Sequence, residues 1–307
     1  MYAFLNCFFR ICFVFLLTLW LTGCRKEVID PSLLGAQAKL TVFSFIAPQD
    51  TLLTVRVRQS QPFFQAKAQP GSAVTETDAT VLISDGTTSV VLAHDREGIY
   101  TASADKLPVL PGRTYFLTVT TPGGLGAKAT CTVPLRANNA ITQTQLEPAT
   151  SGQFEGYFLS VEWQDAPGEG DYYRIFAEPP VMTYRLPGND GQTEQTDTVY
   201  LPAIVFQQGE TYIQDTGQDG QFFRVAKGGF TTNILTSGRN NVQFERKIKV
   251  ILLTTDRAYY QYHQSLQRYQ EAKPTNPFVE PSFVFSNIEG GLGVFAAYQK
   301  YEQEVRF

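Results

Sequence analysis

The chain has 307 residues, with 25 Lys plus Arg against 29 Asp plus Glu, and a formal net charge of −4. A slightly acidic chain with only 18% charged residues lacks the basic face that nucleic-acid binding requires, so we expect no nucleic acid as a partner. His94 and His263 are the only two histidines, which excludes a metal site built on several imidazoles.

An apolar segment near the N-terminus ends in a cysteine. Arg10 precedes the uncharged stretch 11–20, and Gly23 stands directly before Cys24. This pattern is typical of a signal peptide and is shorter than a membrane-spanning helix. Because the cysteine follows small residues, the segment resembles the lipobox of bacterial lipoproteins. We therefore predict a signal peptide over 1–23, cleavage between Gly23 and Cys24, and lipidation of Cys24. The alternative is an uncleaved membrane anchor in which the cysteine stands by chance.

Cleavage at this point would leave Cys131 as the one unmodified cysteine, since Cys7 and Cys12 leave with the signal. An internal disulfide is then impossible, and the fold must be held by its core. Residues 24–37 are predicted to be an acylated tether. Its Lys26-Glu27 pair resembles the export signal of lipoproteins displayed on the surface of Bacteroidota, which favours the outer face of the outer membrane.

Alternating apolar and polar residues predict short strands over 38–136. Expected strands include 40–46, 53–57, 79–84 and 114–119, and Asp85-Gly86 favours a two-residue hairpin. Seven or so strands in about 100 residues are typical of an Ig-like β-sandwich, in which Cys131 would be buried.

A polar break after Pro134 predicts a second, β-rich domain over 137–307. Its expected strands include 158–163, 172–177, 221–225 and 247–253. The fold class is therefore predicted to be mainly β, with two β-sandwich-like domains, of which the second carries one C-terminal helix.

That amphipathic helix is predicted over 256–272, where Asp256 can cap its first turn. Aromatic and apolar residues recur at helical spacing, at Tyr259, Tyr262, Leu266 and Tyr269. We expect this stripe to pack on the second sheet, with ligand contact as the alternative, and we expect His263 to be exposed.

A glycine-rich motif near the C-terminus suggests a dinucleotide site but lacks the required context. Residues 291–296 match G-x-G-x-x-A, yet only eleven residues follow Ala296. A dinucleotide-binding fold needs an acidic residue about 20 positions later and parallel strands around it. We instead expect the glycines to form a tight turn into a last strand over 294–298.

A second motif resembles half of a calcium-binding loop. Asp215 and Asp219-Gly220 fit, but Gly217 and Ala226 stand where further ligands are needed. A turn is therefore the expected structure. Neither histidine is accompanied by a nucleophile elbow, and no pair of carboxylates is singled out. We predict no catalytic residues, no metal and no cofactor.

Motifs along most of the chain resemble those of one bacterial family. The strongest run from Asn276 to Pro281 and from Ser286 to Tyr298; others are 78–81, 98–100, 112–115, 171–175 and 259–262. With the lipobox, they resemble the Bacteroidota lipoproteins of domain of unknown function family 4249. The resemblance implies an outer-membrane lipoprotein that accompanies a TonB-dependent receptor, and it brings no catalytic residues with it.

The expected function is that of a non-enzymatic binding or accessory subunit, lipid-anchored at the cell surface, which assists a TonB-dependent receptor barrel in nutrient uptake. Tyr184, Tyr200 and Tyr212, expected in loops of the second domain, are candidate ligand contacts. Two alternatives stay open. One is a surface hydrolase for glycan or peptide, which would need a deep cleft with two close carboxylates. The other is a structural or adhesive envelope protein.

Overall fold

Most of the described chain is β-strand, because apolar and polar residues alternate along it. The computed structural model describes residues 38–60, 74–135, 141–151, 154–168, 170–179, 181–187, 194–199, 204, 206, 211–231, 242–271 and 283–307. The predicted signal peptide, Gly23, Cys24 and the tether up to residue 37 lie outside these ranges. No helix in the described ranges combines the length and the apolar character that a membrane crossing needs.

The first part of the described chain forms short antiparallel strands around one core. The elements are β1 (Leu40–Ile46), β2 (Leu52–Gln59), β3 (Val74–Thr75), β4 (Thr80–Ser84), β5 (Ser89–Arg96), β6 (Ile99–Ser103), η3 (Ala104–Lys106), β7 (Thr114–Thr120) and β8 (Gly126–Thr132). Alternate residues are buried: Leu53, Val55 and Val57 of β2 point into the core, whereas Thr54 and Arg56 are exposed. Cys131 of β8 is buried in the same core, as predicted.

The second part supplies longer strands and one α-helix. Its elements are β9 (Ile141–Ser151), β10 (Phe154–Gln164), β11 (Tyr172–Glu178), β12 (Met182–Pro187), β13 (Glu194–Val199), β14 (Tyr212–Gln214), β15 (Phe222–Thr231), β16 (Val242–Phe244), β17 (Lys247–Thr255), α2 (Arg257–Glu271) and β18 (Gly291–Arg306). A core around Trp163 and Tyr173 packs β10 and β15 on β11 and β17.

The strands form one large sheet and two small ones. The 12-stranded sheet has the order β14-β11-β17-β18-β1-β2-β6-β5-β4-β7-β8, with β3 paired to β2. The other two are three-stranded, with the orders β15-β10-β9 and β13-β12-β16.

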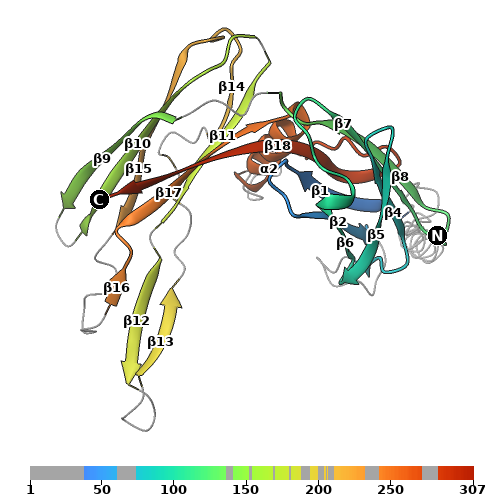
Figure 1. Ribbon diagram of the computed structural model, residues 1–307, viewed down its shortest axis with the longest axis horizontal. Helices are drawn as coiled ribbons and strands as arrows, with labels where there is room; N and C mark the ends of the chain where they lie inside the picture. Colours follow the sequence, from blue (N-terminus) through green and yellow to red (C-terminus); the bar gives the residue numbers. More distant parts are fainter. Residues whose placement is uncertain are drawn as a thin grey trace, which may run out of the picture. The chain divides into compact units, whose positions relative to one another are not determined.

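Strand β18 connects the two parts of the large sheet (Figure 1). Its residues Gly291–Ala297 pair in parallel with β1, and Tyr298–Arg306 pair antiparallel with β17. Because side chains alternate across a strand, one face of β18 serves two cores: Phe295 packs in the first core and Tyr301 against the second. The opposite face, including Val294, packs in the cluster beneath α2.

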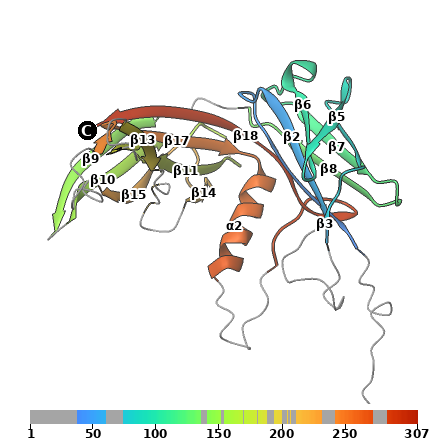
Figure 2. The same cartoon turned by 90° about the horizontal axis from the view of Figure 1, so that it is seen from below.

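Helix α2 packs against β18, β11 and β14 of the large sheet, and Figure 2 shows it beside β18. Asp256 caps it, since its Oδ1 accepts a hydrogen bond of 2.8 Å from the Tyr259 N–H. Within the predicted stripe, Tyr259 is 4% exposed whereas Tyr269 is 57% exposed. The packing therefore holds for the first turns of the helix and is lost at its C-terminal end.

The mainly β class with one C-terminal helix is confirmed. The boundary at 136–137 stays a prediction. The last strand is much longer than the expected 294–298, because pairing with β17 continues through half-exposed residues as far as Arg306.

Candidate functional site

A cavity of about 540 Å³ opens between β14, β15 and α2. Aromatic rings, side-chain amides and one guanidinium line it: Tyr212, Ile213, Gln214, Thr216, Gln218, Phe222, Phe223, Arg224, Tyr260 and Gln264. A hollow of this size fits a small ligand or a short polymer segment, and its polar groups can fix an orientation. A smaller cavity of about 180 Å³ is rimmed by Lys247 and Lys249, whose ammonium groups pair with Glu304 and Glu178. Its charges are therefore already compensated.

Of the three tyrosines predicted as ligand contacts, Tyr212 lines the larger cavity. It lies in β14, which pairs with β11 so that Tyr212 stands opposite Arg174. Tyr184 lies in β12, the middle strand of a three-stranded sheet, where it pairs with Asp197 and Val242. Tyr200 lies outside the described residues.

Tyr212 is held by a cluster of rings around a guanidinium. The Arg174 guanidinium lies 5.3 Å from the centre of the Tyr212 ring and 5.0 Å from that of Phe176. Its Nη1 donates a 2.6 Å hydrogen bond to the Tyr259 hydroxyl. Burial raises the pKa of Tyr212, with the Arg174 charge acting in the opposite direction. The cluster fixes one wall of the cavity.

The expectation that His263 is exposed was wrong. Its ring stacks on Tyr212 at 5.6 Å and 11°, and it also contacts Phe45 and Tyr259. Burial, and then the nearby Arg174 charge, lower the pKa of His263 to about 4. The side chain is therefore neutral at pH 7 and packs as an aromatic ring. Helical spacing could reveal the contact with Tyr259, four residues earlier on α2, but not those with Phe45 of β1 and Tyr212 of β14.

Paired aspartates tie together the two loops at the end of the cavity. Asp165 and Asp215 are only 2% and 1% exposed, and with Asp171 each offers a carboxylate oxygen within 4.8 Å of the others. Asp215 Oδ2 accepts hydrogen bonds from the N–H groups of Gly170 (2.9 Å) and Asp171 (3.1 Å). Asp165 accepts one from the Tyr173 hydroxyl and one from the Gly220 N–H.

This arrangement joins the 165–171 loop to the 215–221 loop. Backbone bonds reinforce it, from Asp165 N to Gln221 O at 2.9 Å and from Asp215 N to Asp171 O at 3.2 Å. Carboxylate oxygens are the ligands that Ca²⁺ prefers, but the N–H and hydroxyl donors already compensate the charges of Asp165 and Asp215. The loop geometry thus fixes Thr216 and Gln218 in the cavity wall. The expected absence of a metal stays a prediction.

Asp256 joins the start of α2 to the middle of β18. Its Oδ2 accepts from the Ala297 N–H at 3.0 Å, and its own N–H donates to the Ala297 carbonyl at 2.9 Å. Burial raises the pKa of Asp256 to about 7, although the N–H donors oppose the shift. The folded protein then retains a proton that the unfolded chain loses near pH 4. The contribution of Asp256 to stability therefore falls as the pH rises from about 4 to about 7.

The glycines of the C-terminal motif allow β18 to lie close to its neighbours. A Cβ on Gly293, where φ is +109°, would lie 2.0 Å from the Val42 carbonyl oxygen of β1. A Cβ on Gly291 would lie 2.7 Å from the Leu40 carbonyl oxygen. Asn287 adds a side-chain bridge, accepting from the Phe295 N–H at 3.0 Å and donating to its carbonyl at 2.8 Å. The motif is thus structural. The expected turn is limited to Gly290, whereas Gly291 and Gly293 lie within β18 and allow it to pair closely with β1.

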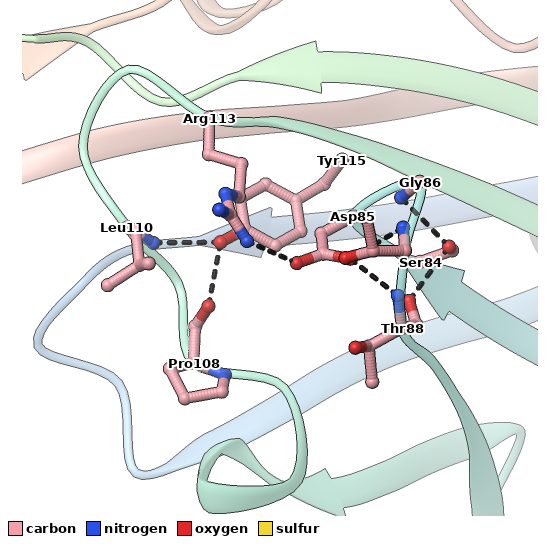
Figure 3. A network of polar contacts seen from close by, with 9 residues as sticks. Ser84, Asp85, Gly86, Thr88, Pro108, Leu110, Arg113 and Tyr115 are labelled. Carbon is pink, nitrogen blue, oxygen red and sulfur yellow. Dashed lines mark hydrogen bonds and ion pairs between the residues drawn. The ribbon is translucent and has the colours of Figure 1, made fainter.

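The motif at residues 112–115, one of those that carry the family resemblance, also has a structural role (Figure 3). The Tyr115 hydroxyl accepts from the Leu110 N–H at 2.8 Å and donates to the Pro108 carbonyl at 2.7 Å, which closes the loop before β7. Arg113 pairs with Asp85 at 2.5 Å. The Thr88 N–H, the Thr87 hydroxyl and N–H, and Arg113 hold the pKa of Asp85 well below its usual range.

None of the curated proteins matches this chain in sequence. A family model does match, over residues 26–304, which include the helix and all the strands described above except the last two residues of β18. The chain therefore belongs to the family described as Domain of unknown function (DUF4249).

Proposed function

We propose that this chain is a lipid-anchored, surface-exposed binding protein of the outer membrane, which serves a TonB-dependent receptor as a non-enzymatic accessory subunit in nutrient uptake. In this proposal Cys24 carries the lipid, and the cavity between β14, β15 and α2 holds the ligand. The lipobox and the family resemblance support the anchoring and the receptor partner.

The cavity is the observation that carries the binding function. Among the described residues that line it, there is no Asp, Glu or His. General acid–base catalysis and glycoside hydrolysis depend on such groups. The aromatic rings of Tyr212, Phe222 and Tyr260, the amides of Gln214 and Gln264, and the Arg224 guanidinium are instead typical of recognition.

The close carboxylates of Asp165, Asp171 and Asp215 do not favour the hydrolase alternative. Asp165 and Asp215 are almost fully buried, and their hydrogen bonds go to backbone N–H groups and to the Tyr173 hydroxyl. A catalytic pair would need to face a cleft that admits substrate. We therefore assign Asp165 and Asp215 to the structure of the loops.

The first test is purification of the tagged, acylated protein from outer membranes in mild detergent, followed by mass spectrometry of what co-purifies. We expect a β-barrel receptor in stoichiometric amount. A matched preparation of the Phe222→Ala variant should retain the barrel and lose the ligand held in the cavity, because Phe222 is 59% exposed and supports no core. A lone lipoprotein that degrades glycans or peptides would contradict the proposal.

A further inference from the structure

Two strand edges face the larger cavity. Among the described residues, none pairs with the outer edge of β14, and Phe206 bridges the outer edge of β15 at Gly228, beyond the part of β15 that lines the cavity. Strand β14 ends the 12-stranded sheet, and β15 ends a three-stranded sheet. The two strands follow one another in the chain and are joined by the aspartate-tied 215–221 loop. The cavity therefore lies at an open border between two sheets that share one core.

On β14, the backbone groups that no described residue pairs with belong to Tyr212 and Gln214. The Ile175 N–H donates to the Thr211 carbonyl at 3.1 Å, and the Asp215 N–H donates to the Asp171 carbonyl at 3.2 Å. In an antiparallel pair, residues that bond to the partner alternate with residues whose N–H and C=O face the other side. Thr211 and Asp215 face β11, so Tyr212 and Gln214 present their backbone groups to the free edge.

The same alternation holds on β15. The Asp165 N–H donates to the Gln221 carbonyl at 2.9 Å, and the register then places Phe222 opposite Gln164 and Arg224 opposite Glu162. Phe222 and Arg224 are thus the residues whose backbone groups point away from β10. All four outward-facing residues, from both edges, line the cavity.

We propose that the ligand is an extended peptide segment, which enters this cavity and adds as a strand to the Tyr212–Gln214 edge. The inference rests on the proposed function, since it uses the same cavity, and it names the ligand class. Strand addition satisfies the open N–H and C=O groups, while side chains on one face of the peptide occupy the pocket. Extended polypeptide is the ligand whose hydrogen-bonding groups repeat at the spacing of this edge.

Charge indicates one feature of the peptide. Arg224 is exposed, and no described carboxylate forms an ion pair with it, although Glu162 stands opposite it on β10. The amides of Gln214, Gln218 and Gln264 are neutral. The peptide therefore carries an acidic side chain at the position beside Arg224, where a guanidinium and a carboxylate can pair.

The test begins with a phage-displayed library of random dodecapeptides, selected on the full acylated protein in detergent. A selected peptide is then synthesised with a single N-methyl group at each position in turn. N-methylation removes one N–H donor, so a peptide paired as a strand loses about tenfold in affinity at every second residue and little at those between. We also expect an acidic residue in the selected sequences, and weaker binding by the Arg224→Gln variant.

The protein offers a matched pair of variants at one residue. Gln214→Pro removes the outward N–H, and proline is tolerated at a sheet edge where that group is unpaired. Gln214→Ala removes the side chain but keeps the N–H. We expect about tenfold weaker peptide binding by the proline variant than by the alanine variant, with equal melting temperatures. The N-methyl scan remains decisive if the proline variant fails to fold.

The outcomes separate this inference from the proposed function. Failure to select a peptide, or N-methyl effects without a period of two residues, overturns strand addition. If a glycan array instead yields a ligand whose binding is lost in Phe222→Ala, the cavity remains the binding site and the peptide class is rejected. If neither peptides nor glycans bind, the cavity is rejected as a ligand site altogether.

Discussion

Replacing Gly293 by alanine tests the close approach of β18 to β1. The added Cβ would lie 2.0 Å from the Val42 carbonyl oxygen and 2.9 Å from its carbonyl carbon, so backbone must move. Gly124, in the turn before β8, is the matched control: its φ of +82° is also positive, and an added Cβ would meet nothing within 4 Å. Comparing Gly293→Ala with Gly124→Ala separates the cost of the clash with Val42 from the cost of placing an alanine at a positive φ.

The expected difference can be worked out from these two environments. A positive φ costs an alanine about 1–2 kcal/mol at either position. At Gly293 the clash adds an overpacking penalty of about 1–3 kcal/mol, and the β1–β18 hydrogen bonds are disturbed as well. We therefore expect Gly293→Ala to lower the free energy of unfolding by about 4 kcal/mol, against about 1–2 kcal/mol for Gly124→Ala.

Thermal unfolding followed by circular dichroism measures the difference. A change of 1 kcal/mol shifts the midpoint by roughly 2–4 °C in a chain of this size, so Gly293→Ala should melt about 5–10 °C below Gly124→Ala. Equal midpoints for the two variants would refute the reasoning, because they would mean that β18 can move away from Val42 at no cost.

Three further predictions follow from other contacts. The melting temperature of Asp256→Asn should rise from pH 4 to 6.5, because the pH dependence is then set by His263, whose pKa is lowered to about 4 in the folded protein. The melting temperature of His263→Gln should fall from pH 4 to 7, because the raised pKa of Asp256 then sets it. Parallel profiles for the two variants would contradict both assignments. Asp215→Ala should cost about 2–4 kcal/mol in urea unfolding, since it leaves two backbone N–H groups without their acceptor, and a cost below 1 kcal/mol would exclude this role. Cys24→Ala should leave the fold intact and release the protein from membranes, as fractionation and mass spectrometry would detect; a variant still acylated would refute the lipobox.

Local pattern predicted many of the strands and the helix, because each depends on neighbouring residues, but Tyr184 and Tyr212, which were expected in loops, lie in β12 and β14. The alternation of Leu53, Val55 and Val57 indicated β2, and the spacing of Tyr259 and Tyr262 indicated α2. The long extension of β18 was missed, since it depends on pairing with β17.

The candidate site was harder to predict, because its residues meet only through the fold. Tyr212 was selected from the sequence as an aromatic residue in a loop, but its ring lies against His263 and Arg174, which belong to other elements. Asp215 was noted for its spacing to Asp219, whereas its hydrogen bonds go to Gly170 and Asp171, more than 40 residues away in sequence. No periodicity reports contacts of that kind.

The parallel pairing of β1 with β18 has a consequence for how the chain folds. Val42 of β1 lies beside Gly293 of β18. One edge of β1 pairs with β2, and its other edge therefore stays unpaired until β18, the last described strand, has been added. Contacts between residues so distant in sequence form slowly, because a very long loop must close first. A chain interrupted before residue 291 would present β1 as an unprotected edge, open to pairing with other chains. Nascent or truncated forms should therefore be the species that aggregate, and protection of β1 until the C-terminal strand arrives becomes a requirement for correct folding.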